Sequence, residues 1–336
     1  MGCGYKIITA GTLRLILTGV ILVSGLVMNC GANKGDETEV DLLEYFRKRI
    51  EEFREDGKFR GKIDSDVIAE ELNEENIRPA ATAIKYDTDH VAMQAAKMLV
   101  QFGFQLDPLY DSGIKILRDE LIIRTLLEKG LNETGPLADY ILETIQKHTP
   151  PEHIAKFGPL FIDRLESTPD QTLLLIIAKG KVLKARKILE REENQSRMSG
   201  WEEYKIALAA LGDEELEAPY IDRFMKTDDP ETKAGLAAKL GLIGTRNALA
   251  ALAEEVRTGL VIEMTNVMRK SVRLDIIAAM SYNYPDREFL YDNAITSDEG
   301  YQRVEEFCRE KFGVTWEKER PDFLTIQGFP SEPAPE

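Results

Sequence analysis

Apolar residues recur every three or four positions along most of this chain, a spacing that predicts helices. The first clear stripe lies within residues 39–60 and consists of Leu43, Phe46, Ile50 and Phe53. Residues at these spacings share one face of an α-helix, and the opposite face here is rich in Arg, Lys and Glu. We interpret 39–60 as an amphipathic helix that caps the folded body. Docking of a partner, or pairing in a coiled coil, is the alternative.

Residues 63–316 keep the helical period and lack the alternating β-branched runs typical of strands, so they predict helices without a strand. An internal repeat is visible in this region. Gly180, Gly212 and Gly244 lie 32 residues apart, each behind an Ala- or Leu-rich segment. A glycine just past a helix takes the left-handed conformation without the cost of a Cβ. Each of the three is therefore predicted to end a helix.

The starts of these helices are marked as well. Asp229 precedes Pro230 and predicts a helix N-cap followed by proline at the first helical position. Asp170 repeats this pattern after Pro169, and Asp89 opens a third segment. The core face predicted for that third segment consists of Val91, Ala95, Met98, Leu99 and Phe102.

These segments resemble short HEAT repeats, which have an Asp-rich turn, a helix with paired alanines and a Gly-terminated end. The paired alanines are Ala95-Ala96, Ala209-Ala210 and Ala237-Ala238, and Lys233 stands where the family usually has Arg. The resemblance covers residues 87–103 and about 168–258. It implies an all-α fold, an α-solenoid that winds as a right-handed superhelix of HEAT-like helix pairs over 63–316.

The C-terminal part of the chain predicts a closure of that array. Residues 301–316 form a segment that is predicted to be helical up to Gly313, with aromatic residues that would cover the last repeat. Solenoids need such a cap over the exposed end of their core. Residues 317–336 are rich in Pro and Glu and are predicted to be a disordered tail.

The N-terminal segment has a different pattern. Lys6 and Arg14 precede an uncharged apolar run, Leu15 to Met28, that is shorter than the roughly 20 residues a membrane-spanning helix needs. Extending the run back to Ile7 would place Arg14 in the hydrocarbon. A secretory signal in residues 1–29 fits better.

The end of this run resembles a bacterial lipoprotein signal, in which a cysteine becomes the lipidated first residue. The sequence Leu26-Val27-Met28-Asn29-Cys30 forms the box, with Asn29 where the family usually has a small residue. The resemblance implies lipidation of Cys30, a flexible tether over 30–38 and a place on the bacterial cell envelope. The residue directly after the cysteine is Gly31 rather than Asp, which by the same resemblance favours the outer membrane as the location of the protein. A plain signal peptide or an uncleaved anchor is the alternative.

Charge and composition narrow the classes of partner. The chain has 59 acidic and 43 basic residues, a formal net charge of −16. A surface of this sign repels phosphate backbones and argues against nucleic acid as a partner. The three cysteines, Cys3, Cys30 and Cys308, are too scattered for a disulfide framework or a zinc site. Cys308 is expected to be a buried thiol.

Residues that could carry chemistry are few. His148 and His153 flank a Pro-Pro turn rather than sharing a helical face, which argues against metal binding. The sequence contains no P-loop, dinucleotide fingerprint or nucleophile elbow, and its acidic clusters fall at helix starts or on solvated faces. We therefore expect no enzyme activity, no metal, no cofactor and no small-molecule substrate.

One basic segment interrupts the acidic chain. On a helix, Lys184, Lys187 and Arg191 would share one face, while Val182, Ala185 and Ile188 would point inward. An ordinary solvated face is one interpretation. The other is a basic strip on the groove side that receives an acidic partner segment or an anionic headgroup or polymer.

Three functions follow from these patterns. The first is a membrane-tethered helical-repeat scaffold for protein–protein interaction at the cell envelope, because stacked repeats present an extended surface. The second is a lyase-related or enzyme-accessory protein, since some short HEAT-like repeats occur in such proteins. The third is a purely structural envelope lipoprotein.

Overall fold

The computed structural model describes residues 41–57, 72–110, 113–263, 269–284, 297–317 and 319–320. All of them belong to the compact unit Val40–Glu336. The predicted signal (1–29), Cys30 and the rest of the tether (30–38), and most of the predicted tail lie outside the described residues. The described helices contain no segment long and apolar enough to cross a membrane.

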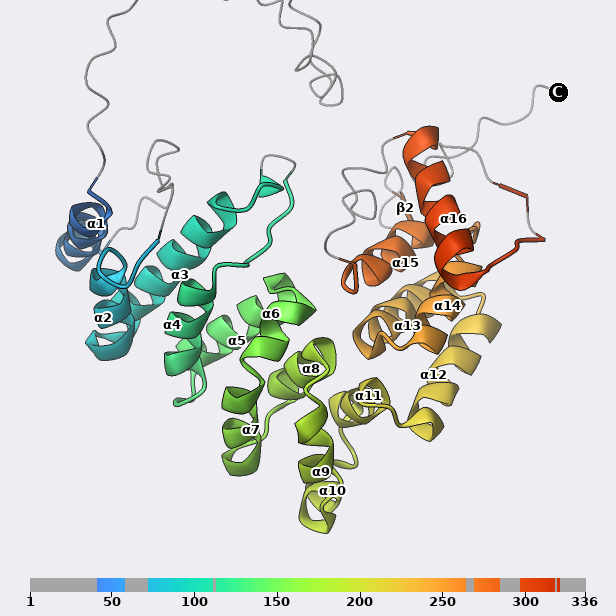
Figure 1. Ribbon diagram of the computed structural model, residues 1–336, viewed down its shortest axis with the longest axis horizontal. Coiled ribbons are helices and arrows are strands. Elements are labelled where there is room, and N and C mark those ends of the chain that lie inside the picture. The colour runs from blue at the N-terminus through green and yellow to red at the C-terminus, as the bar shows by residue number, and fades with distance from the viewer. Residues whose placement is uncertain are drawn as a thin grey trace, which may run out of the picture. The chain divides into compact units, whose positions relative to one another are not determined.

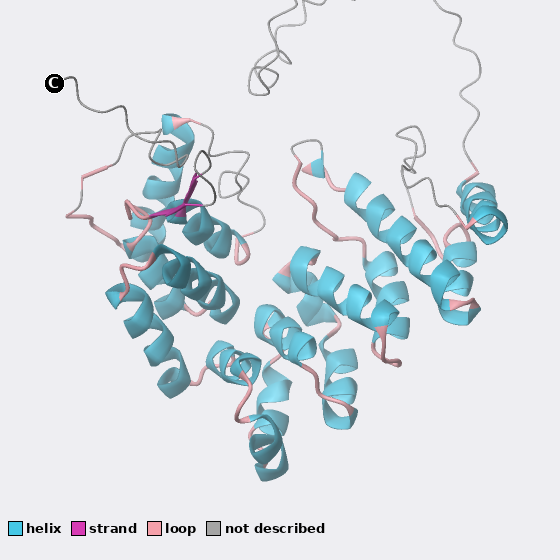
Figure 2. Cartoon of the chain, turned by 180° about the vertical axis from the view of Figure 1, so that it is seen from behind, coloured by secondary structure: helices cyan, strands magenta, loops and turns pink. Residues whose placement is uncertain are grey.

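The described chain is mostly helical, so the all-α prediction is confirmed (Figure 2). The helices of the first half are α1 (Leu42–Asp56), α2 (Arg78–Tyr86), α3 (Asp89–Gln105), α4 (Glu120–Gly130), α5 (Pro136–His148), α6 (Pro151–Lys156), α7 (Gly158–Ser167) and α8 (Gln171–Gly180). A 3₁₀ turn, η2 (Leu183–Ala185), and the short α9 (Arg186–Leu189) and α10 (Glu192–Met198) follow. The remaining helices are α11 (Glu202–Ala210), α12 (Glu214–Lys226), α13 (Pro230–Ile243), α14 (Arg246–Glu254), α15 (Val272–Ser281) and α16 (Asp298–Phe312).

Helices that are close in the chain lie side by side (Figure 1). One row of contacts runs through α3, α5, α8, α11, α13 and α15, each packed on the next. Other helices cover this row, with α2 packed on α3, α4 on α5, α12 on α13 and α14 on α15. A single apolar core extends from Phe46 in α1 to Cys308 in α16.

The first helix faces that core. α1 packs on α2 and α3, and its buried residues are Leu42, Phe46, Ile50 and Phe53. The predicted stripe was therefore wrong at one position, because Leu43 is only partly buried and Leu42 takes its place. Both leucines lie within one turn of Phe46, and packing against the neighbouring helices decides between them.

Capping residues define the helix ends largely as predicted. The carboxylate of Asp229 accepts from Thr232 N at 2.8 Å, Pro230 is the first residue of α13, and Gly244 ends it with φ 54°. The carboxylate of Asp170 likewise accepts from Leu173 N at 2.8 Å. In α3 the whole predicted face from Val91 to Phe102 is buried, although the N-cap is Thr88.

Gly180 departs from the prediction. It is the last residue of α8, and the left-handed residue is Lys181, with φ 49°. A Cβ on Gly180 would lie 2.9 Å from Ile154 Cβ and 3.4 Å from Ala155 N. Glycine is needed there because α6 approaches the helix closely, not because the backbone turns.

A short hairpin interrupts the helices. β1 (Val261–Glu263) pairs antiparallel with β2 (Arg269–Ser271), with Val261 opposite Ser271. The prediction of no strand was wrong here. Three residues a strand are too few to show the alternation by which strands are recognised.

Candidate functional site

The predicted basic strip is divided among three elements. Lys184 lies in η2, Lys187 in α9 and Arg191 just before α10, so the prediction of one shared helical face was wrong. The continuous helix that the prediction required is broken between Lys187 and Arg191, because α9 ends at Leu189 and Arg191 has an extended backbone. Arg191 pairs with Glu166, with 2.9 Å between Nη2 and Oε1.

Lys184 and Lys187 remain on the surface together with an apolar neighbour. Both lysines are exposed, and neither forms an ion pair with another residue in the described part of the chain. Leu183, beside Lys184, exposes 69% of its surface. This small patch of Leu183, Lys184 and Lys187 is positive and apolar in an acidic protein.

The more unusual lysines of this segment are the two beside Gly180. The side chain of Lys179 is almost fully buried and donates from Nζ to the carbonyls of Gln146 at 2.7 Å and Lys147 at 3.3 Å. These carbonyls belong to the last turn of α5, where helix carbonyls lack partners within the helix. Its ammonium also lies 5.4 Å from the ring centroid of Tyr282, the residue after α15.

Lys181 reaches in another direction, to the end of α13. Its Nζ donates to the carbonyl of Ile243 and, at 3.3 Å, to that of Leu242. Asn283 donates to Gly241 O in the same turn at 2.8 Å. Gly244 leaves room for both donors, because a Cβ there would lie 3.1 Å from Lys181 Nζ and closer still to the Asn283 amide.

Burial changes the acidity of both lysines. Desolvation lowers the pKa of Lys179 to about 7, partly opposed by the nearby Glu152. Desolvation also lowers the pKa of Lys181 to about 8, partly opposed by Glu217. The predicted basic strip did not include these two lysines. The signal that could have identified Lys179 is its position directly after the apolar run Leu173–Ala178.

Other buried charges connect neighbouring helices. Lys233 pairs with Glu255, with 2.8 Å between Nζ and Oε2. The carboxylate of Glu217, in α12, accepts from Thr245 Oγ1 and, at 3.1 Å, from Ala248 N at the start of α14. Asp107 and Arg118 pair at 2.7 Å. In each case the charge stabilises a helix end or a connection between helices.

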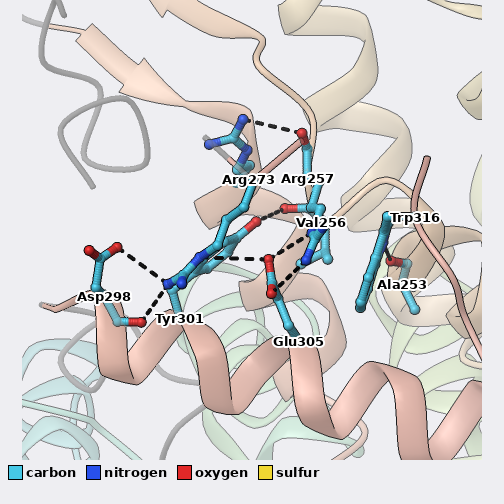
Figure 3. Close-up of polar contacts among 9 residues, drawn as sticks. Ala253, Val256, Arg257, Arg273, Asp298, Tyr301, Glu305 and Trp316 are labelled. Carbon is cyan, nitrogen blue, oxygen red and sulfur yellow. Dashed lines mark hydrogen bonds and ion pairs between the residues drawn. The ribbon is translucent and has the colours of Figure 1, made fainter. Parts of the chain in front are cut away.

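A cluster of polar and aromatic side chains joins α14, α15 and α16 near the C-terminal end of the described chain (Figure 3). Arg257 donates from Nε and Nη2 to the two carboxylate oxygens of Glu305, at 2.8 Å each. Its guanidinium also lies 4.6 Å from the ring centroid of Trp316, whose Nε1 donates to Ala253 O at 3.1 Å. The bidentate pair ties α16 to Arg257, just after α14, and the indole holds Trp316, which follows α16, against the end of α14.

The same cluster contains buried groups from α15 and α16. Tyr301 is fully buried and donates to Val256 O at 2.6 Å, and Arg273 donates to Arg257 O at 3.2 Å. Arg320 donates to Asp298 O at 2.7 Å and lies over the Tyr301 ring. Gly313 ends α16 with φ 72°, as predicted. Of the aromatic residues in 301–316, Tyr301 is buried and Trp316 contacts the end of α14.

The two histidines that flank the Pro-Pro turn have different neighbours. His148 Nδ1 is 2.9 Å from Lys115 O, whereas His153 Nδ1 is 3.9 Å from Glu120. Desolvation lowers the pKa of both histidines. Within the described residues no three His, Cys, Asp or Glu side chains come together as metal ligands. Cys308 is buried, and desolvation raises its pKa to about 12.

A recess between α1 and α3 is lined by Arg49, Phe53, Val91 and Met98 and is too small to hold a water molecule.

Comparison of the chain with models of protein families, with curated proteins and with solved structures found no match.

Proposed function

We propose that this protein is a lipid-tethered helical-repeat scaffold that binds another protein at the bacterial cell envelope. We infer that the helices form an α-solenoid with a right-handed superhelical path. The observation that carries this proposal is the order of helix contacts, in which α3, α5, α8, α11, α13 and α15 pack in succession on one continuous core. Such stacking gives a long surface relative to its volume, over which binding specificity can be spread.

The placement of buried polar groups favours binding over catalysis. Lys179, Lys181 and Glu217 bond to helix ends, and Lys233 and Arg257 pair with carboxylates between helices. A catalytic set would instead direct several such groups into one cavity beside a substrate.

The patch of Leu183, Lys184 and Lys187 is the contact surface that we assign to the partner. An acidic partner segment with an apolar side chain fits it, because the lysines supply opposite charge and the leucine an apolar anchor. Arg191, predicted as the third member of the strip, is already engaged by Glu166 and is left out.

Site-specific cross-linking tests the partner in the bacterium itself. A photoreactive phenylalanine at position 183 is expected to give a discrete protein adduct, which Lys184→Glu together with Lys187→Glu abolishes. The matched control is Lys205→Glu with Lys226→Glu, which reverses two charges on α11 and α12 and should leave the adduct intact. An adduct that survives reversal at 184 and 187 removes the patch from the proposal.

The lipid anchor is tested separately by the mass of the mature N-terminus. A diacylglycerol-modified Cys30, absent from a Cys30→Ala variant, is the expected result. A chain that keeps residues 1–29 would instead indicate an uncleaved anchor.

A further inference from the structure

The turn after α8 contacts helices that are not its neighbours in the chain. Most helix contacts join elements close in sequence, but α8 packs on α5, α11 and also α13. Two side chains extend these contacts. We call Lys179 and Lys181, which lie on either side of Gly180, the lysine clamp.

Lys179 joins a helix before α8 to one well after it. Its ammonium bonds to the carbonyls of Gln146 and Lys147 at the end of α5 and lies over the ring of Tyr282 at the end of α15. The two contacts involve residues 146–147 and residue 282, and in the chain α11 and α13 lie between these positions. One buried cation thus satisfies a helix end and an aromatic face from distant parts of the chain.

The side chain of Lys181 joins the same turn to α13, and its backbone conformation is energetically unfavourable. It has the only positive φ among the described non-glycine residues, at 49°. Such a conformation is unfavourable for a residue with a Cβ and persists where the surroundings compensate. The compensation visible here is donation from Nζ to the carbonyls of Ile243 and Leu242. Asn283 bonds to the same end of α13 from the α15 side.

The geometry points to a conformational role: the lysine clamp makes α5, α8, α13 and α15 open and close as one cooperative unit. In a simple repeat array each unit is held by its nearest neighbours, and segments open independently. Ties that skip a helix pair oppose this, because α13 cannot move from α8 without breaking the bonds from Lys181 Nζ to the carbonyls of Leu242 and Ile243. A partner bound to any of these helices would meet a rigid surface.

A simpler role for Lys181 makes the opposite prediction for one substitution. If Lys181 only ended α8, Lys181→Gly would relieve the positive φ, and the native state would open less often. If Lys181 is part of the clamp, the same substitution removes its tie to α13. The α13 and α15 amides would then open more often, despite the relieved backbone.

Hydrogen exchange of the full chain, resolved by peptide and followed at low denaturant, separates these cases. In the wild type, peptides from α5, α13 and α15 are expected to share one opening free energy. In Lys181→Gly and Lys181→Met, α13 and α15 are expected to exchange at least tenfold faster, while α5 stays near its wild-type rate. Lys187→Met, an exposed lysine in the following turn, is the control and should change neither.

Two results would overturn the clamp. One is exchange in α13 and α15 that is unchanged or slower in Lys181→Gly. The other is wild-type protein in which α5, α13 and α15 already open with separate free energies. Asn283→Ala removes the second tie to α13 while keeping Lys181, and it is expected to speed exchange in the same helices to a smaller degree.

Discussion

Lys233 and Glu255 form an ion pair inside the core, with 2.8 Å between Nζ and Oε2 and side chains only 4% and 10% exposed. The ammonium also lies 5.2 Å from the ring centroid of Phe224 and 3.4 Å from Thr227 O. Lys233 joins the first turn of α13 to the residue that follows α14.

Removing one partner of this pair should be costly. Lys233→Met leaves the Glu255 carboxylate buried without its cation, so we expect a loss of about 3 kcal/mol or more in the free energy of unfolding. Lys239→Met is the control, because Lys239 pairs with Glu202 at 2.7 Å on the surface and should contribute less than about 1 kcal/mol. Urea unfolding measures both. Equal losses would contradict the assignment.

Two glycines in helices should respond oppositely to alanine. Gly180→Ala introduces a Cβ against Ile154, and we expect it to destabilise the protein by about 1–3 kcal/mol. Gly235, on the exposed face of α13, has no atom within 4 Å of a Cβ built there. Gly235→Ala should therefore stabilise by about 0.5–1 kcal/mol, because alanine loses less backbone entropy in a helix. Thermal or urea unfolding of the two variants provides the check.

The buried lysines predict a rise in stability with pH. The pKa of Lys179 is about 7 in the folded protein, against 10.5 for an ordinary lysine. Between these values the unfolded chain binds more protons, so the free energy of unfolding increases with pH, by up to about 1.4 kcal/mol per unit for one group. Lys181, with a pKa of about 8, contributes in the same direction above pH 8.

Comparison with Lys179→Met isolates this contribution. Urea unfolding at pH 7, 8 and 9 should show a steeper rise for the wild type than for the variant. The groups near Lys179, including Glu152, His148 and Lys147, are common to both proteins. Parallel pH profiles for the two proteins would show that the proton of Lys179 is not linked to folding.

Cys308 should be unreactive while the protein is folded. Its thiol is fully buried, with a pKa raised to about 12, and the thiolate is the form that reacts. Iodoacetamide at pH 8 is expected to leave Cys308 unmodified in the native chain and to modify it in urea, as read by peptide mass. Rapid native labelling would mean that α16 opens frequently.

Trp316 should contribute to the stability of the C-terminal end. Its indole bonds to Ala253 O and stacks on Arg257 (Figure 3). Trp316→Ala is expected to lower the free energy of unfolding by about 1–3 kcal/mol, since both contacts and the apolar area are lost. Thr315→Ala, at the exposed neighbouring residue, serves as the comparison and should have little effect.

The fold could be predicted from local signals where those signals act within one helix. Asp229, Pro230 and Gly244 bound α13 as expected, because a cap depends only on a few neighbouring backbone groups. Gly313 at the end of α16 is another such case. The alternation in the short β1–β2 hairpin was too brief to be recognised.

The candidate site could be predicted only in part. Lys184 and Lys187 are exposed as a basic patch, but Arg191 belongs to another element and pairs with Glu166. A period of three and four residues groups side chains only while one helix continues. That continuity ends between Lys187 and Arg191, because α9 stops at Leu189 and Arg191 has an extended backbone.

The amino-acid sequence alone determined the helical class and the ends of helices such as α13 that are marked by capping residues, because periodicity and capping are local properties. Only the tertiary structure decided that Gly180 serves close packing, that Lys181 turns left-handed, and that Lys179 is buried between α5 and Tyr282. These features depend on carbonyls and rings contributed by helices far away in the chain. The local sequence around a lysine next to a glycine does not indicate which distant helices that lysine contacts in the folded protein.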